Sequence, residues 1–430
     1  MLQDHPLRRE LIGEMHARPF LGFQGPAEVL HLAFKPEGRG IGVDHAAEYA
    51  HLAALLRSEG AAAPDREANH LVTEFRDLQM KWERHTEFVS YTFIRPRAQA
   101  EPFSDGPEDW LPHDWLSGAP GRVIAAAWLH AESVETAEEA EALVTGPLRE
   151  HFQEDSLATA WVTGRRCAVA GDFRLDPRGL TRFAMVSTSG LGARRIGRVA
   201  QRLVEIETYR AMAMLALPIA REMSAQLPAL GEQLAEIIDA LASDRAMAED
   251  RKTLDRLTRL SADLERLSAT SAFRFNAARA YSSIVEDRIR TLREEKIAER
   301  QSFEDFMLRR FSPAMRTCEA ADARLETLSK RAERAGNLLR TRVDVSLEEQ
   351  NQELLLSMNR RAELQLRLQQ TVEGLSVVAI SYYAVSLAGY LVAPLAKAAG
   401  LSLTLVKALV AVPIIAGVWF MVRQIRNHVK

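Results

Sequence analysis

The spacing of hydrophobic and polar positions changes twice along this chain. Up to about residue 190, short apolar runs rich in β-branched and aromatic residues alternate with turn residues, a pattern that predicts β-strands. From 190 to 373, prolines are few and apolar residues recur at steps of three and four, which predicts long helices. Beyond 373, charged residues become rare. The chain therefore has an α/β part, a helical part and an apolar C-terminal part.

The first part, residues 1–189, is predicted to be a mixed α/β sandwich. The expected strands are AEVLHLAFKP, HLVTEFRDLQ, EFVSYTFIRP, RVIAAAWLHA, SLATAWVTG, RCAVAGDFRL and TRFAMVST. The expected helices are HPLRRELIGEMHAR, DHAAEYAHLAALLRSEG and ETAEEAEALVTGPLREHF, and a proline-rich loop covers residues 97–120. Because several strands follow one another without a helix, some of the pairing is expected to be antiparallel.

The second part, residues 190–373, is predicted to be a region of long, coiled-coil-like helices. Its apolar stripes are Leu257, Leu260, Leu264 and Leu267, then Ile196, Val199, Leu203 and Ile206, and then Leu325, Leu328, Ala332 and Ala335. Pro218, Pro228 and Pro313 are the expected breaks. The last helix contains no proline before the apolar part, so we expect it to continue into that part without interruption.

The third part, residues 374–422, is predicted to be a hairpin of two transmembrane helices in the lipid bilayer. The segment from Gly374 to Ala396 is 23 residues without a charge. A helix needs about 20 residues to cross a hydrocarbon core of ~30 Å. The second span runs from Leu401 to Val422 if the side chain of Lys407 reaches the interface. A buried soluble hairpin is the alternative.

The basic residues around the two spans predict the orientation of the hairpin. Before and after it stand Arg360, Arg361, Arg367, Arg423, Arg426 and Lys430, whereas the connecting segment has only Lys397 and Lys407. Short segments rich in Lys and Arg stay in the cytoplasm. Both ends of the chain, including the basic tail 423–430, are therefore expected there.

Composition excludes several classes of function. With 55 basic and 58 acidic residues in 430, the formal charge is −3, which gives no general attraction to nucleic acid. The two cysteines, Cys167 and Cys318, imply neither a disulfide framework nor a structural zinc. The N-terminus MLQDHPLRRE is charged and precedes no apolar run, so no signal peptide is expected. P-loop, His-Glu-x-x-His, Cys-x-x-Cys and Gly-x-Ser-x-Gly motifs are absent, so neither an enzyme nor a cofactor is expected.

The preferred ligand site on the soluble side is a group of three arginines, Arg194, Arg195 and Arg198. They follow the segment Ser187–Gly190, which we expect to cap the start of a long helix. Arginines at a helix N-terminus oppose the helix dipole, and an anion, an acidic partner or a neighbouring subunit would relieve this. The alternative is a capped domain junction.

Small residues in the first span are candidates for helix packing or for lining a pore. These are Ser381, Ala384, Ala388 and Gly389, which would allow close approach of helices in an oligomer. Ser376, Ser381 and Ser386 are separated by five residues and so do not share one helix face, which favours an anchor over a channel.

Three further patterns have simpler structural explanations. His5, Arg9, Ile12 and His16 fall at helical steps, Gly38, Gly40 and Gly42 lie between an expected strand and helix, and Trp110, His113, Asp114 and Trp115 lie in the loop. A solvated helix face, a tight connection and a loop packed on the sheet explain them as well as a metal, phosphate or partner site does.

Two stretches carry a resemblance to a known family. HPLRRELIGEMHARP and LLRTRVDVSLEEQNQELLLSMNRRAELQLRLQQTVEGLSVVAISYY resemble the bacterial membrane-anchored proteins of domain-of-unknown-function family 3422, over the whole chain. The resemblance implies a bacterial inner-membrane anchor and brings no activity with it. More distantly, the order of parts is similar to CorA-like magnesium and zinc transporters. Their Gly-Met-Asn signature is absent from GYLVAPLAKAAGLSLT, and the connection has two lysines and no acid.

Two functions are compatible with these features. The first is an oligomeric inner-membrane protein of CorA-like architecture with possible ion transport, in which the α/β domain senses an ion or another ligand. The second is a non-transporting, membrane-anchored scaffold or sensor that presents its α/β and helical parts to an unidentified cytoplasmic partner. A homo-oligomer is expected in the first, and an enzyme acting at the membrane surface is a third possibility that rests on location alone.

Overall fold

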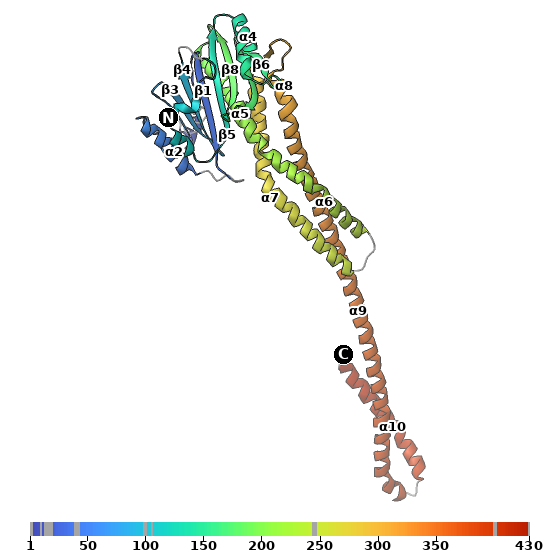
Figure 1. Cartoon of the computed structure of the whole chain (residues 1–430). Coiled ribbons are helices and arrows are strands. Elements are labelled where there is room, and N and C mark those ends of the chain that lie inside the picture. Colours follow the sequence, from blue (N-terminus) through green and yellow to red (C-terminus); the bar gives the residue numbers. More distant parts are fainter. Residues whose placement is uncertain are drawn as a thin grey trace. The chain divides into compact units, whose positions relative to one another are not determined.

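The computed structural model describes residues 3–8, 11–12, 20–37, 44–97, 101–104, 106–242, 247–398 and 402–428 (Figure 1). The chain forms two compact units. The first consists of Met1–Ser243 with Thr253–Ala335, and the second of Asp244–Lys252 with Gly336–Lys430.

The first unit is built on one sheet of nine strands in the order β2-β3-β4-β1-β5-β8-β7-β6-β9. The strands are β1 (Ala27–Lys35), β2 (His70–Phe75), β3 (Leu78–Arg84), β4 (Val89–Pro96), β5 (Arg122–Val134), β6 (Ala158–Val162), β7 (Cys167–Leu175), β8 (Thr181–Thr188) and β9 (Glu295–Lys296). Neighbouring strands are antiparallel except β5 and β8, which are parallel. The predicted mixed α/β fold is confirmed.

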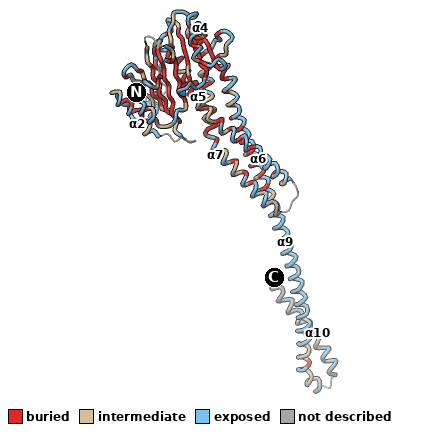
Figure 2. Tube along the Cα trace, in the orientation of Figure 1, coloured by how far each residue is buried: buried red, intermediate tan, exposed pale blue. Residues whose placement is uncertain are grey.

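One face of this sheet holds the larger apolar core. The helices on this face are α2 (His45–Ser58), α3 (His113–Ser117) and α4 (Ala137–Thr145), with 3-10 turns at Pro107–Trp110 and Pro147–His151. Leu52, Leu55 and Leu56 of α2 are fully buried against strand residues such as Trp82 and Trp128. The red segments of Figure 2 follow this core. It encloses mainly aromatic and branched side chains, as the strand pattern predicts.

The opposite face of the sheet is covered by α5 (Ala193–Met214) and part of α7 (Met247–Leu292). Met212 of α5 packs in a small apolar cluster with Phe88, next to the β3–β4 turn, and Tyr281 of α7 lies against the same cluster. Successive residues of a strand point to opposite faces. The apolar cluster is small because many side chains on this face are polar.

Helices α6 (Ala216–Ala242), α7 and the first part of α9 (Ser312–Ala398) pack together within the first unit. Ion pairs join α7 to α6, between Arg256 and Glu236, and α7 to α9, between Arg279 and Asp322. The short helix α8 (Phe303–Phe306) and a π-helical turn (Met307–Phe311) precede α9. The predicted stripes are buried here, except that Leu267 is half-buried. The stripes of α7 and α9 therefore pack helices of one chain, whereas the stripe of α5, from Ile196 to Ile206, packs that helix on the sheet.

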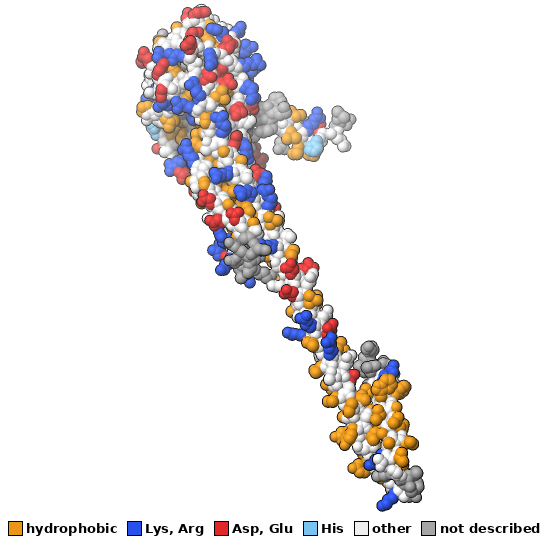
Figure 3. Space-filling model, turned by 90° about the vertical axis from the view of Figure 1, so that its right-hand side faces the viewer, with side chains coloured by type: hydrophobic (Ala, Val, Ile, Leu, Met, Phe, Trp, Pro, Cys, Tyr) orange, Lys and Arg blue, Asp and Glu red, His pale blue; other side chains and the backbone are white. Residues whose placement is uncertain are grey.

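The second unit contains the rest of α9 and helix α10 (Leu403–His428). Helix α9 continues without a break to Ala398, so the predicted uninterrupted helix is confirmed. Among the described residues, two helices are long and apolar enough to cross a membrane, with apolar stretches ending at Leu395 in α9 and spanning Thr404–Gln424 in α10. Figure 3 shows the hydrophobic side chains gathered on this hairpin.

One predicted strand and one predicted helix have limits that differ from those of the structure. HLVTEFRDLQ is not one strand, because the chain turns at Arg76, which has a positive φ of 50°, and returns as β3. The predicted helix 135–152 ends at Thr145 and continues as a 3-10 turn. A Cβ at Gly146 would lie 2.8 Å from the carbonyl oxygen of Ala142, so this position favours glycine and a change of direction.

Pro228 is inside α6 and does not break it. A proline inside a helix removes one backbone hydrogen bond, which predicts a break. Buried apolar residues continue on both sides of Pro228, at Met223, Leu227 and Leu234. Packing of this stripe therefore outweighs the lost hydrogen bond. Pro218 lies in the first turn of α6, as expected, whereas Pro313 follows a π-helical turn inside a helical stretch that begins at Phe303 and is not broken there.

Candidate functional site

Polar side chains form two rows on the face of the sheet that α5 covers. Lys81 of β3 is paired with Thr92 of β4, and Thr92 with His31 of β1, which places these three residues in one row across the sheet. In the next row, Glu83 of β3 is paired with Ser90 of β4. Residues at alternate positions of a strand point to the same face, so the two rows form one polar surface.

His31 is held in one neutral form by two threonines. Its Nδ1 lies 2.8 Å from the hydroxyl of Thr92, and its Nε2 lies 3.0 Å from the hydroxyl of Thr208 in α5. The Thr208 hydroxyl donates to the carbonyl of Val204, so its oxygen accepts a hydrogen bond from Nε2. Burial, with a smaller effect of the Lys81 charge, lowers the pKa of His31 to about 3. At neutral pH this imidazole is a fixed, uncharged part of the site.

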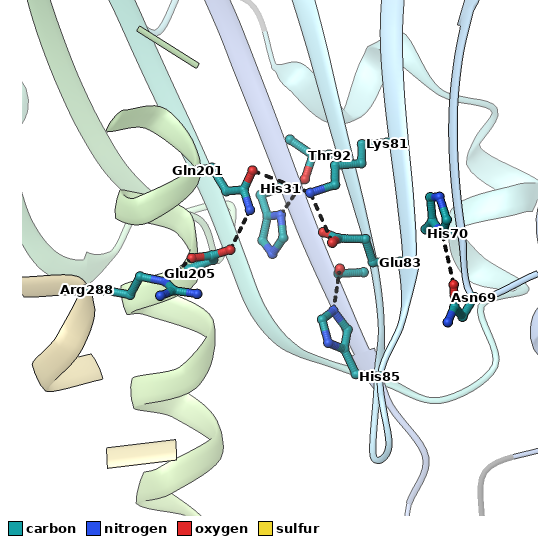
Figure 4. A network of polar contacts seen from close by, with 11 residues as sticks. His31, Asn69, His70, Lys81, Glu83, His85, Thr92, Gln201, Glu205 and Arg288 are labelled. Carbon is teal, nitrogen blue, oxygen red and sulfur yellow. Dashed lines mark hydrogen bonds and ion pairs between the residues drawn. The ribbon is translucent and has the colours of Figure 1, made fainter. Parts of the chain in front are cut away.

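A chain of charged and amide groups crosses from the sheet to α5 and α7 (Figure 4). The ammonium of Lys81 lies 3.0 Å from Glu83 and donates to the side-chain oxygen of Gln201 at 3.4 Å. Gln201 donates in turn to Glu205 at 2.6 Å, and Arg288 of α7 donates to the other oxygen of Glu205. Two cations and two carboxylates thus alternate across the interface.

All of these groups except Lys81 line a cavity of about 150 Å³. Its walls are formed by His31, Glu83, His85, Phe88, Ser90, Gln201, Glu205, Thr208, Tyr209 and Arg288. Glu83 and Glu205 are largely buried, with side chains 11% and 18% exposed, whereas Arg288 is 36% exposed. The cavity is therefore polar, and Arg288 is its most open charged group.

The charges around the cavity are balanced in pairs. Burial acts to lower the pKa of Arg288, but the carboxylate of Glu205 outweighs it and raises that pKa above its usual value. Lys81 likewise neutralises Glu83. A buried carboxylate is tolerated only when it is paired and hydrogen-bonded. A ligand here would meet both a carboxylate and a guanidinium, without an excess of either charge.

Ser90 and His85 form the only serine–histidine contact among the groups that line this cavity. The hydroxyl of Ser90 lies 3.3 Å from Nε2 of His85, whose ring is stacked on Phe88. Ser90 lies within β4, paired with β3 on one side and β1 on the other, so its backbone groups serve the sheet. Acyl transfer needs amide donors that are free to face a developing oxyanion. The arrangement therefore favours binding over this chemistry.

A second buried polar cluster lies on the other face of the sheet. His130 of β5 contacts Glu28 of β1 through Nδ1 and Glu132 through Nε2, the latter at 3.1 Å, and Trp128 donates to Glu28. Burial lowers the pKa of His130, but the hydrogen bonds of Glu132 and Glu28 outweigh it and raise the pKa to about 9. All four side chains are linked by these contacts, so this cluster ties β1 to β5.

The three predicted arginines lie at the start of α5, and all are exposed. The helix is capped by Gly192 and not by the segment Ser187–Gly190, which was wrongly expected to cap it. The hydroxyls of Ser187 and Ser189 instead donate to the backbone carbonyls of Glu132 and Glu135. Ser187, in β8, is thus joined to β5, and Ser189, just after β8, is joined to Glu135, just after β5.

Of the three arginines, Arg198 contacts an aromatic ring. Its guanidinium lies over the ring of Phe20, 4.7 Å from the ring centre. Burial, followed by the charges of Arg198, Arg288 and other nearby groups, lowers the pKa of Arg202. Within the described part of the chain, no carboxylate forms an ion pair with Arg194 or Arg195. An anion or partner at these arginines stays a prediction.

Two of the small residues predicted to lie in the first span pack beside α10 within the second unit. Ala388 and Gly389 line a small cavity together with Val406 and Lys407, and a Cβ at Gly389 would lie 3.2 Å from Cε of Lys407. Ser381 is 7% exposed, and its hydroxyl has no hydrogen-bond partner among the described residues. Ala384 is half-buried. A pore or an oligomer contact at these positions stays a prediction.

The remaining sequence candidates form no site within the described residues. Trp110 and Trp115 are 5% and 7% exposed and belong to the main core. The loop therefore packs on the sheet, which is the simpler of its two explanations. His16, Arg9 and the glycines Gly38, Gly40 and Gly42 lie outside the described residues. No group of three His, Cys, Asp or Glu side chains in the described ranges is arranged to hold a metal ion.

The fold and the site define a class of protein: an α/β unit with a polar cavity, followed by long helices and two helices apolar enough to cross a membrane. A family model described as "Protein of unknown function (DUF3422)" matches residues 3–429, and the chain belongs to this family. No curated protein and no solved structure matches the chain. The comparisons therefore give no support to the CorA-like resemblance.

Proposed function

We propose that this protein is a membrane-anchored sensor whose sheet unit binds a small zwitterionic molecule in the cavity beneath α5. The observation that carries the proposal is that the cavity wall contains both carboxylates, from Glu83 and Glu205, and a guanidinium, from Arg288. Glu83 of β3 and Glu205 of α5 supply acceptors for a cationic group, and Arg288 supplies the planar donor that suits a carboxylate.

The size and composition of the cavity support a ligand of this class. A volume of about 150 Å³ suits a molecule of the size of a small amino acid and is too small for a nucleotide. Phe88, Tyr209 and His85 supply ring surfaces beside the charged groups. A ligand with a single charge would leave one of the two ion pairs broken and uncompensated, which is costly in a partly buried site.

The binding test uses the full chain in detergent. We would follow thermal unfolding with each of the common amino acids and with glycine betaine, each at about 10 mM, chosen to be roughly a hundredfold above Kd or more. Binding to the folded state alone should raise Tm by at least about 2 °C at such an excess. Acetate and ethylammonium, which carry one charge each, should give no rise.

Two variants locate the effect. Glu205→Gln removes one carboxylate of the cavity and should abolish the rise in Tm, whereas Glu138→Gln, on the exposed face of α4, should preserve it. If no zwitterion raises Tm, or if singly charged compounds act equally well, the proposal is wrong.

The proposed anchor is the hairpin of α9 and α10 in the bacterial inner membrane, with both chain ends in the cytoplasm. The supporting observations are the two apolar helices and the excess of basic residues outside them. Ser381 is only 7% exposed within a single chain, which favours an anchor over a channel. The sensor is proposed to act as a homo-oligomer and to report to a cytoplasmic partner.

This orientation predicts the compartment that each end of α10 faces. In intact cells, a membrane-impermeant maleimide applied from outside should label Ser402→Cys, at the start of α10, once it has crossed the outer membrane. It should label Gln424→Cys only after the inner membrane is permeabilised. Cys167 and Cys318 are buried, so the natural chain is the matched background. Labelling of Gln424→Cys from outside would reverse the orientation.

A further inference from the structure

One segment of α9 is exposed along its entire length. Every residue from 347 to 372 is exposed, and Figure 2 shows this part of the helix in pale blue. Leu354 and Leu368 are 60% and 66% exposed, and other large apolar side chains in the segment are similarly open. A polar helix can stand alone in water, but a helix with this much open apolar surface marks an interaction site.

The apolar side chains of this segment follow a seven-residue repeat. Leucines stand at four of five positions spaced seven residues apart, namely Leu347, Leu354, Leu368 and Leu375, and Arg361 occupies the third, middle position of the series. Four residues after Leu347 and Leu354 stand Asn351 and Met358, and the same step leads on to Gln365 and Val372. Alternating steps of three and four with leucine in one of the two positions define a coiled-coil seam.

The charges of the segment support one buried face. Glu349, Glu353, Arg360, Glu363 and Arg367 fall on the side of the helix away from the leucines when successive residues turn by about 100°. Burying the leucine face against another helix would leave these five side chains in water. Asn351 and Gln365 would lie in the seam, where polar residues fix the register of the paired helices.

The direction of the segment selects its partner. Helix α9 continues from this segment into the apolar stretch that we propose to cross the membrane. Copies anchored in the same membrane therefore carry the segment in the same direction and at the same height above the bilayer. This part of the argument rests on the proposed function. We propose that the leucine face of α9 packs against the same face of a second copy as a parallel, in-register coiled coil.

Disulfide cross-linking of the full chain in membranes tests this seam. Parallel, in-register packing brings identical seam positions to within the Cα separation that a disulfide requires. Leu354→Cys and Leu368→Cys, oxidised by air with copper–phenanthroline, should each form covalent dimers. Glu363→Cys, nine residues from Leu354 and therefore on the opposite side of the helix, is the matched control and should give at least about tenfold less dimer.

Mixing the two seam variants tests direction and register. The two positions lie 14 residues apart, or about 21 Å along a helix. Co-expressed Leu354→Cys and Leu368→Cys chains should therefore form no mixed disulfide beyond the level of the Glu363→Cys control. Mixed disulfides would show antiparallel or shifted helices, and equal cross-linking of all three variants would show random collision. Either result would contradict the proposed parallel coiled coil. The ligand-binding test and the maleimide-labelling test examine the sensor and the anchor independently of it.

Discussion

Replacing Arg274 with methionine should cost about 3–5 kcal/mol of the free energy of unfolding, because it leaves a buried carboxylate without its cation. Arg274 of α7 pairs with Glu87 in the β3–β4 turn, and their side chains are 6% and 3% exposed. The hydroxyl of Tyr281 also donates to Glu87, at 3.0 Å, but it carries no charge and does not replace the guanidinium. The pair holds α7 on the sheet, next to the cavity.

Urea unfolding of the full chain in detergent, followed by tryptophan fluorescence, measures this loss. Five of the six tryptophans lie in the sheet unit, at Trp82, Trp110, Trp115, Trp128 and Trp161. The midpoint of unfolding should fall for Arg274→Met and recover in part when Glu87→Leu is added, since the double variant leaves no unpaired charge. Asp255→Ala, which breaks an exposed pair with Arg259, is the control and should leave the midpoint unchanged. Equal midpoints for Arg274→Met and the control would contradict the argument.

Much of the architecture follows from local sequence pattern. Each of the seven predicted strand segments contains a strand, and α2 begins directly after Asp44, whose carboxylate caps it. The continuous helix into the apolar region is likewise predicted by the absence of proline. The missed elements depend on tertiary context. Strand β9 has two residues and exists only because β6 offers an edge, and α6 continues through Pro228 because its apolar stripe is buried.

The candidate site could not be predicted in the same way. Its residues come from β1, β3, β4, α5 and α7, and only the register of three strands brings Lys81, Thr92 and His31 into one row. A signal was present, because Lys81 and Glu83 alternate with the buried Met80 and Trp82 in MKWER. Polar residues at every second position of a strand buried on both faces indicate a polar interface. Reading HLVTEFRDLQ as one strand concealed this alternation.

The arginine candidates show the opposite error. The arginines do lie at the start of a long helix, α5, but the serines expected to cap it bond to the backbone beside the ends of β5 and β8 instead. A local motif cannot show which backbone groups a hydroxyl will reach once strands from elsewhere in the chain lie beside it. The same limit explains why the buried pair of Glu28 and His130, which are 102 residues apart, was not anticipated.

The position of α5 over the cavity depends on one glycine. Gly197 is on the buried side of the helix, where a Cβ would lie 1.6 Å from the carbonyl oxygen of Leu21. That oxygen belongs to the backbone, so no change of side-chain rotamer can relieve the contact. Gly197→Ala must therefore displace either the segment around Leu21 or α5 itself. Overpacking of this kind costs about 1–3 kcal/mol, and a clash with backbone should reach the upper end of this range or exceed it.

The same urea titration separates this clash from the ordinary effect of alanine in a helix. Gly231, within α6, would place its Cβ 3.7 Å from Leu328, an ordinary contact. Gly231→Ala should therefore raise the midpoint, since alanine stabilises a helix interior by roughly 0.5–1 kcal/mol over glycine. Gly197→Ala should lower it and weaken any zwitterion binding, because Gln201 and Glu205 are one and two turns further along α5. A gain in stability for both variants would mean that α5 does not lie this close to Leu21, and the cavity would need a different wall.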